Sequence, residues 1–375
     1  MVWTGCLTWF PGRACPDPTV TQISTELHFS AADLPTSRSN GRPELATLGE
    51  MPRVAVGNKF LERVQKPSEP SSPRRGGEVL WTEKHSPEEP AVYYRHPGGG
   101  ELWIGDSLKW LAGLAEGSVD LIFADPPYNI GKAEWDDFGS HDAYIEWSVQ
   151  WIAMASRALK PSGSLYVCGF PEVLADIRRP GAGFFSGCRW LTWFYKNKAN
   201  LTRDWGRSHE AIIHYRKSKK TRINVDDVRI PYGRHTLKYP SHPQATSSQY
   251  GRGHKRKDAW TPHPRGAKPR DVIEVPVTSN GMVEKTPHPT QKPEELVRRF
   301  ILASSNQGDV VVDPFSGSGT TPVCAEQLGR RWLACDINPE YCHWATLRLQ
   351  NIESRTVEEW IEFDRVTAER REAIR

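Results

Sequence analysis

The chain has 375 residues, 25% charged and 38% hydrophobic, a balance typical of a globular protein that buries a core. Its formal net charge is only +4, and no apolar run approaches the ~20 residues that a membrane span requires. The N-terminus lacks the basic lead-in of a secretory signal, so neither a membrane protein nor a secreted one is expected.

The seven cysteines are odd in number and include no Cys-x-x-Cys pair. This usage favours a reducing compartment and argues against a disulfide framework or a zinc site. We therefore expect a cytoplasmic protein that holds no metal.

Residues 1–91 are rich in Pro, Ser, Arg and Glu and show no sustained hydrophobic periodicity. Such a composition is typical of a linker or a disordered segment. We predict a disordered or variable N-terminal extension here and assign it no function.

Residues 92–215 alternate between short apolar runs and amphipathic segments. Strands are expected at 101–106, 119–124, 164–168, 189–195 and 211–215, and helices at 107–115 and 142–159. Strands that alternate with helices predict an α/β fold with a doubly wound, mostly parallel sheet.

Asp125, Pro126, Pro127 and Tyr128 directly follow the apolar run 119–124. At the mouth of a parallel strand these residues form a compact, rigid pocket. The carboxylate and a backbone carbonyl can accept two hydrogen bonds from an exocyclic amine, while the aromatic side chain stacks on the attached ring. That combination fits a flipped-out nucleobase. An ordinary Asp-Pro turn after a strand is the alternative.

Residues 216–276 interrupt this pattern with a basic segment. Between residues 216 and 270 the chain has 15 Lys and Arg against 3 Asp, a formal charge of +12, which leaves −8 for the remainder. A basic segment in an acidic body predicts a polyanionic partner, because phosphate neutralisation supplies most of the affinity for nucleic acid. A solvated basic linker is the alternative.

Residues 277–352 resume the α/β pattern. Helices are expected at 293–304, from Pro322 and from Asn338–Pro339, and strands at 309–313 and 331–336. The glycine-rich loop 315–321 follows the first strand, and Asp336 ends the second, where it can accept hydrogen bonds from ribose hydroxyls. No Walker lysine follows the loop, so a nucleoside without a phosphate chain, such as S-adenosylmethionine, is favoured over a triphosphate. The alternative is a tight turn that serves only packing.

The order of these motifs resembles the signature of the DNA amino-methyltransferases. Asp125–Tyr128 precedes Phe315–Gly319 with a basic segment between them, which looks like the β class, and His288–Pro293 is similar to a third family motif. The resemblance covers roughly residues 92–352. It implies a Rossmann-like methyltransferase fold, S-adenosylmethionine as cofactor and double-stranded DNA as partner.

The resemblance also implies a division of the chain. Residues 92–215 become the catalytic half, 216–276 an inserted target-recognition region, and 277–352 the cofactor-binding half. Residues 353–375 are expected to form a C-terminal helical tail. A homodimer is a possible assembly, because several β-class members pair.

Carried over position by position, the resemblance assigns roles to the catalytic motif. Asp125 and the carbonyl of Pro126 are expected to accept from the target amine, with Pro127 beside them and Tyr128 stacked on its ring. The cofactor is expected to contact the following residues: Asp106, His288, Thr290, Asp313, Phe315, Gly317, Ser318, Gly319 and Asp336. The last of these should hold the ribose, and the first should lie near the adenine.

Adenine N6 is the expected methyl acceptor. The run Asp125–Ile130, with Trp135–Asp137 downstream, looks most like adenine-modifying members. Cytosine N4 stays open as the alternative, although members that modify cytosine more often begin the motif with Ser. A silent DNA-binding module and an RNA or protein-side-chain methyltransferase are less favoured. The Pro-Cys dipeptide expected for ring-carbon cytosine methylation is absent from the sequence.

Overall fold

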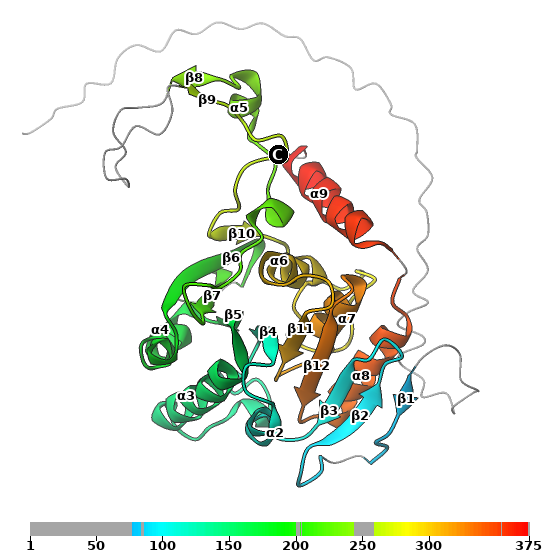
Figure 1. The fold of residues 1–375 in the computed structure, drawn as a ribbon. Coiled ribbons are helices and arrows are strands. Elements are labelled where there is room, and N and C mark those ends of the chain that lie inside the picture. The colour runs from blue at the N-terminus through cyan, green and yellow to red at the C-terminus, as the bar shows by residue number, and fades with distance from the viewer. Residues whose placement is uncertain are drawn as a thin grey trace, which may run out of the picture. The chain divides into compact units, whose positions relative to one another are not determined.

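The computed structural model describes residues 77–83, 86–199, 203, 205–243, 259–353 and 355–373 (Figure 1). Most of the extension predicted over residues 1–91 lies outside these residues. So does the densest part of the basic segment, Lys255–Lys257.

A mostly parallel sheet forms the centre of the described chain. Its spatial order is β1-β2-β3-β12-β11-β4-β5-β7-β6-β10. The five parallel strands at its centre are β3 (Glu101–Ile104), β12 (Arg331–Asp336), β11 (Val310–Asp313), β4 (Val119–Ala124) and β5 (Leu159–Gly169). β7 (Arg207–Arg216) runs antiparallel between β5 and β6 (Gly187–Ala199). The predicted doubly wound, mostly parallel sheet is confirmed.

Helices cover both faces of this sheet (Figure 1). α6 (Glu294–Ser304), α7 (Thr320–Gln327) and α8 (Pro339–Gln350) share one core with the sheet, and α2 (Ser107–Gly113), α3 (His141–Ala158) and α4 (Pro171–Gly181) share the other. Strand β4 contributes to both, because successive side chains point to opposite faces. Leu121 and Phe123 belong to the first core, and Ile122 and Ala124 to the second.

Local capping explains where the helices begin. The Ser140 side chain accepts from the N–H of Ala143 at the start of α3, and Asn338 caps α8 just before Pro339, as predicted. The predicted start of α7 at Pro322 is wrong. Gly319, with φ +77°, makes the turn, and the helix begins at Thr320. Pro322 fits there because the first-turn N–H groups have no intrahelical acceptor.

Two predicted segment boundaries do not coincide with the sheet. β1 (Glu78–Val79) pairs with β2 (Ala91–Arg95), so strand structure begins before residue 92. β10 (Val272–Glu274) lies within the basic segment 216–276, yet it pairs with β6 as an edge strand. Composition determines both predicted boundaries, and composition alone does not detect a short edge strand.

The rest of the basic segment forms small elements, and a helix follows α8. The segment contains a 3-10 turn η3 (Val225–Val228), α5 (Arg234–Lys238) and the pair β8 (His242–Pro243) and β9 (Ala259–Trp260). Two further 3-10 turns are η1 (Glu134–Asp136) and η2 (Ala182–Phe184). α9 (Val357–Ala373) lies within the predicted C-terminal tail.

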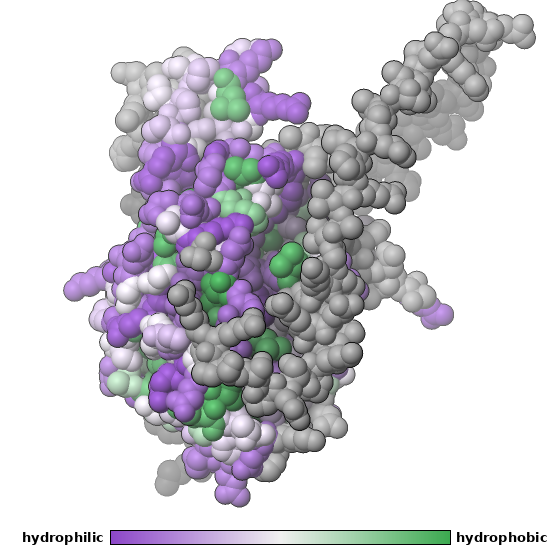
Figure 2. Space-filling model, turned by 90° about the vertical axis from the view of Figure 1, so that its right-hand side faces the viewer, coloured by the Kyte–Doolittle hydropathy of each residue, from purple (hydrophilic) through white to green (hydrophobic). Residues whose placement is uncertain are grey.

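The described surface is predominantly polar on the face seen in Figure 2, with apolar side chains in small separate groups. None of the described helices is both long and apolar enough to cross a bilayer.

A buried ion pair joins α9 to α6. The Arg298 guanidinium of α6 donates to both carboxylate oxygens of Asp364 at 3.0 and 2.8 Å, and its side chain is only 3% exposed. The exposed Arg365, one position further along α9, pairs with carboxylates at the surface.

Arg298→Ala should therefore destabilise the fold far more than Arg365→Ala. The first change leaves a buried carboxylate without its cation, which costs about 3–5 kcal/mol of unfolding free energy. The second removes two exposed ion pairs, each worth less than ~1 kcal/mol. Urea unfolding followed by tryptophan fluorescence measures both, and equal losses would contradict this account of α9.

Candidate functional site

The site lies where the strand order reverses. β4 and β11 are neighbours, but the chain continues from β4 towards β5 and from β11 towards β12. In open α/β sheets such a reversal leaves a crevice outside the carboxyl ends of the strands. A cavity of about 270 Å³ occupies that position. Twelve of the thirteen residues predicted for the site line it, and Gly319 does not.

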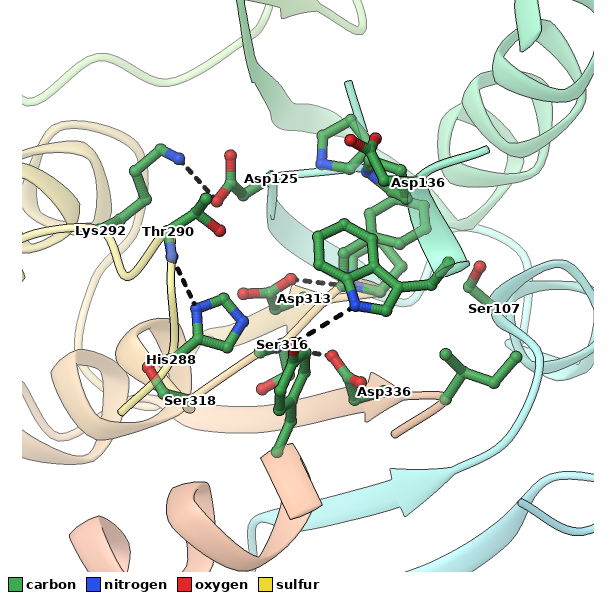
Figure 3. A pocket seen from close by; sticks show the side chains of 18 of the residues that line it. Ser107, Asp125, Asp136, His288, Thr290, Lys292, Asp313, Ser316, Ser318 and Asp336 are labelled. Carbon is green, nitrogen blue, oxygen red and sulfur yellow. Dashed lines mark hydrogen bonds and ion pairs between the residues drawn. The ribbon is translucent and has the colours of Figure 1, made fainter. Parts of the chain in front are cut away.

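Asp125, directly after β4, forms one end of this cavity (Figure 3). Its Oδ2 accepts from Lys292 Nζ at 2.7 Å, and its Oδ1 accepts from the Tyr128 hydroxyl at 2.8 Å. The Tyr128 hydroxyl also lies 2.9 Å from Oε2 of Glu210, on β7. The carboxylate is thus held between a buried cation and a phenol.

The charges at this end are well defined. Burial acts to lower the pKa of Lys292, but Asp125 and Glu210 outweigh it and hold that pKa above its usual value. Burial, followed by the same two carboxylates, raises the pKa of Tyr128 well above 10.0. The lysine is therefore charged and the phenol protonated at neutral pH.

Packing fixes the walls around Tyr128. The ring of Phe170 meets it edge-on with centroids 5.0 Å apart, and the Arg207 guanidinium lies 4.0 Å from the Phe170 centroid. The carbonyl of Pro127 accepts from the Tyr144 hydroxyl at 2.9 Å. The two prolines restrict the backbone, so this end of the cavity is rigid.

Asp136 organises the loop that follows Tyr128. Its buried carboxylate accepts from the N–H groups of Asn129, Ile130 and Lys132 at 2.6, 3.2 and 3.0 Å. The preceding residue, Trp135, donates a hydrogen bond from Nε1 to the hydroxyl of Tyr341 on α8 at 3.3 Å. The loop thereby spans the cavity between β4 and α8.

The glycine loop after β11 forms the opposite end. The N–H of Gly317 donates to Asp336 Oδ2 at 2.7 Å, and the residue has φ +51°. A Cβ at this position would lie 3.0 Å from Nε2 of His288. Gly317 therefore keeps both the turn and the close approach of the two loops.

Gly319 is expected from the sequence to contact the cofactor, but it packs against α8 and does not line the cavity. A Cβ there would lie 2.6 Å from Cβ of Ala345 on α8, and the residue also has a positive φ. Its small size serves helix packing behind the loop, and it does not face the cavity.

Three carboxylates face this cavity from successive strand ends: Asp125, Asp313 and Asp336 (Figure 3). Burial raises the pKa of Asp313 to about 7, with a smaller contribution from the negative charges of the other two. Burial likewise raises the pKa of Asp336 to about 6. These carboxyl groups therefore favour a cationic ligand, which would stabilise their ionised forms.

His288 and Thr290 lie beside the glycine loop. The N–H of Thr290 donates to Nδ1 of His288 at 3.3 Å. Burial and then the charge of Lys292 lower the pKa of His288 to about 3, so its ring is neutral.

The remaining predicted residues also have structural partners. Asp106 caps α2 by accepting from the N–H of Lys109 at 2.9 Å. Phe315 packs its ring 5.3 Å from that of Trp151. The carbonyl of Ser318 accepts from Arg348 at 2.9 Å.

The profile of the N6_N4_Mtase family, described as DNA methylase, matches residues 119–347, more than half of the chain. The chain belongs to this family of DNA methylases. The resemblance to DNA amino-methyltransferases is therefore confirmed. Members of the family use S-adenosylmethionine, which is the cofactor expected from the sequence.

Individual relatives agree with this assignment. The type II methyltransferase M.HpaI of Haemophilus parainfluenzae is 35% identical over 256 residues, 67% of this chain and 74% of its own. The DNA adenine methyltransferase YhdJ of Escherichia coli is 35% identical over 260 residues, 68% of this chain and 84% of its own. The solved PvuII cytosine-N4-specific DNA methyltransferase has a TM-score of 0.50 at 18% identity, covering 76% of this chain and 96% of its own, which shows the shared fold.

The cavity fits this cofactor chemically. S-adenosylmethionine carries a sulfonium and an ammonium against one carboxylate. Five aspartates line the cavity: Asp106, Asp125, Asp136, Asp313 and Asp336. Within the described residues, Oγ of Ser316 is buried in the glycine loop without a hydrogen-bond partner. It can therefore bond to a ligand. Among the same residues, no group of three or more His, Cys, Asp or Glu side chains could hold a metal ion.

Sequence reasoning missed several cavity residues. Lys292 belongs to the His288–Pro293 run, whose resemblance to a family motif was the available signal. Asp136 and Trp135 belong to the run Trp135–Asp137, whose residue types bear on the choice between adenine and cytosine but do not indicate a cavity contact. Tyr341 gave no signal, and neither did Glu210, which contacts Tyr128 without lining the cavity. The places of both depend on which elements become neighbours.

Asp136→Ala should release the loop after Tyr128. Three backbone N–H groups lose their acceptor, so amide hydrogen exchange at 129–132 should accelerate about tenfold or more. Asp137→Ala is the matched control, since that exposed neighbour accepts only from Gly139 among the described contacts of its side chain. Exchange that is equally fast in both variants would contradict the role given to Asp136.

Proposed function

We propose that the protein transfers a methyl group from S-adenosylmethionine to the N6 amine of an adenine flipped out of duplex DNA. The observation that carries this proposal is the position of Asp125. It follows β4 at the strand-order reversal, in one continuous cavity with the glycine loop and Asp336. The carboxylate proposed to accept hydrogen bonds from the target amine and the proposed cofactor site thus share one cavity.

At the base end, Asp125 and the carbonyl of Pro126 accept the two amine hydrogens. These bonds localise the nitrogen lone pair, which is otherwise delocalised into the ring, and point it at the methyl group. Pro127 keeps the backbone in place, and Tyr128 stacks on the base. Because a sulfonium methyl is already activated, alignment supplies much of the acceleration.

At the cofactor end, we assign the methionine part to Asp313, Phe315, Gly317 and Ser318. His288 and Thr290 border it. Asp336 takes the ribose hydroxyls, since its carboxylate ends β12 and faces the cavity beside the glycine loop. Asp106 lies near the adenine. Gly319 supports this wall through its contact with α8.

Adenine is favoured by two observations. The catalytic motif begins with Asp, and YhdJ, a DNA adenine methyltransferase, aligns over 84% of its length. Cytosine N4 is the second candidate, because the PvuII enzyme shares the fold and both bases present an amine beside a ring nitrogen. We assign target recognition to residues 216–276, on the strength of their charge, and leave the homodimer as a proposal from family resemblance.

Incubation with methyl-labelled S-adenosylmethionine and mixed-sequence duplex DNA tests the proposal. After digestion to nucleosides, labelled N6-methyldeoxyadenosine is the expected product. Labelled N4-methyldeoxycytidine would show that the target base is cytosine, and every proposed residue role would stay the same. Label found in tRNA or protein, and none in DNA, would overturn the proposal.

Asp125→Ala should abolish methyl transfer while leaving DNA binding largely intact, because the side chain aligns the amine and does not contact phosphate. Transfer rate and a gel-shift titration measure the two properties. Transfer near the wild-type rate in this variant would refute the role of the carboxylate.

Cofactor affinity should depend on pH through Asp313. A cation binds best to the ionised carboxylate, and Asp313 has a pKa raised to about 7. The affinity should therefore rise from about pH 5.5 to about pH 8 and then level off, by up to about tenfold per unit on the acid side. Calorimetric titration measures it.

Two controls sharpen this test. Asp313→Asn keeps the hydrogen bond to the N–H of Phe315 but cannot ionise. Its affinity should therefore rise much less between about pH 6.5 and pH 8, because the remaining carboxyl, Asp336, has a pKa of about 6. S-adenosylhomocysteine lacks the sulfonium charge and should also respond less. An affinity of the wild-type protein that is constant across this range would contradict the cation-binding role.

A further inference from the structure

The carboxylate assigned to the target amine already has a partner on each oxygen. Lys292 donates to Oδ2 of Asp125 at 2.7 Å, and the Tyr128 hydroxyl donates to Oδ1 at 2.8 Å. An amine that approaches this carboxylate must compete with one of them. Lys292 is a buried cation that is attracted to the Asp125 carboxylate, so the Tyr128 phenol is the partner that the amine displaces.

The Tyr128 hydroxyl has one proton and two acceptors. It lies 2.8 Å from Oδ1 of Asp125 and 2.9 Å from Oε2 of Glu210. A phenol can donate only one hydrogen bond at full strength. The two distances are nearly equal, so the proton can turn from one carboxylate to the other without displacement of the ring.

We propose that Glu210 is a positioning residue that accepts the Tyr128 hydroxyl when the target amine takes Asp125. The exchange is cheap because the hydroxyl keeps an acceptor in both states, whereas a buried donor without an acceptor is costly. The Tyr128 ring keeps its place and can stack on the base throughout. This inference rests on the proposed function.

Lys292 makes the arrangement possible. Its Nζ lies 2.7 Å from Asp125 and 3.5 Å from Glu210, and its side chain is 6% exposed. Two carboxylates that share one phenol would otherwise repel each other. The ammonium offsets this repulsion and fixes Oδ2 of Asp125, which leaves Oδ1 as the oxygen that exchanges partners.

The position of Glu210 in the fold supports this reading. It lies on β7, opposite Trp193 of β6, and its side chain is only 14% exposed. Trp193 donates to the carbonyl of Val275, so the strand beside Glu210 is held in place. A fixed, largely buried carboxylate at this distance from a phenol is suited to accept its hydrogen bond.

Glu210→Ala should slow the methyl-transfer step itself. With only Asp125 as acceptor, the phenol competes with the amine, and the single-turnover rate at saturating duplex DNA should fall about tenfold to a hundredfold. Cofactor affinity should be unchanged, because Glu210 does not line the cofactor end. Glu353→Gln, which removes an exposed carboxylate, serves as the charge control and should keep the wild-type rate.

The decisive variant combines Glu210→Ala with Tyr128→Phe. Removal of the competing hydroxyl should make the double variant about threefold or more faster than Glu210→Ala alone. A purely structural Glu210 predicts the opposite, since each loss would add to the other. A wild-type rate in Glu210→Ala, or a double variant no faster than the single one, would overturn the inference.

Two further measurements keep the test decisive. Thermal melting reports whether Glu210→Ala folds, and if it does not, Glu210→Met fills the volume without an acceptor oxygen and takes its place. Wild-type protein in the same assay reports on the proposed function separately. Absence of transfer by the wild type refutes the function, whereas transfer by the wild type with no rescue refutes only the role of Glu210.

Discussion

The pairing of β4 with β11 is the constraint on which the site depends. Two residue pairs, Leu121 with Val311 and Ile122 with Val312, join strands that lie 190 positions apart in the sequence. The Asp120 carboxylate strengthens this strand pairing by accepting a hydrogen bond from the N–H of Val310 at 3.0 Å. Because the strands are parallel, Asp125 and Asp313 emerge at the same edge of the sheet. A shift in this register would separate the base end from the cofactor end.

Much of this arrangement could be predicted from sequence because its signals are local. Apolar runs located the central strands, and Asp125–Tyr128 and the glycine loop fell at strand ends as expected. The contact between Lys292 and Asp125 could not be predicted, since it depends on which strands become neighbours. The two glycines show the same limit: Gly317 faces the cavity and Gly319 faces Ala345, yet in sequence they are alike.

The charges in the cavity explain how the protein can bind a cationic cofactor without strong repulsion between carboxylates when the cofactor is absent. Asp125 is neutralised by Lys292, whereas Asp313 and Asp336 have no such partner among the described side chains. Their pKa values, raised to about 7 and about 6, let them take up protons when no cation is present. Binding of a sulfonium would return them to the carboxylate form, so the attraction develops only with the ligand.

The loop after Tyr128 connects the two ends of the cavity physically. It begins at the ring assigned to the base and is fixed internally by Asp136, and its Trp135 reaches Tyr341. The Tyr341 ring in turn packs against His288, with centroids 4.4 Å apart. Disorder in this loop would therefore loosen the base-stacking ring and the cofactor wall together. Since transfer requires the amine, the methyl group and the sulfur in one line, a single well-ordered loop that contacts both ends contributes directly to that alignment.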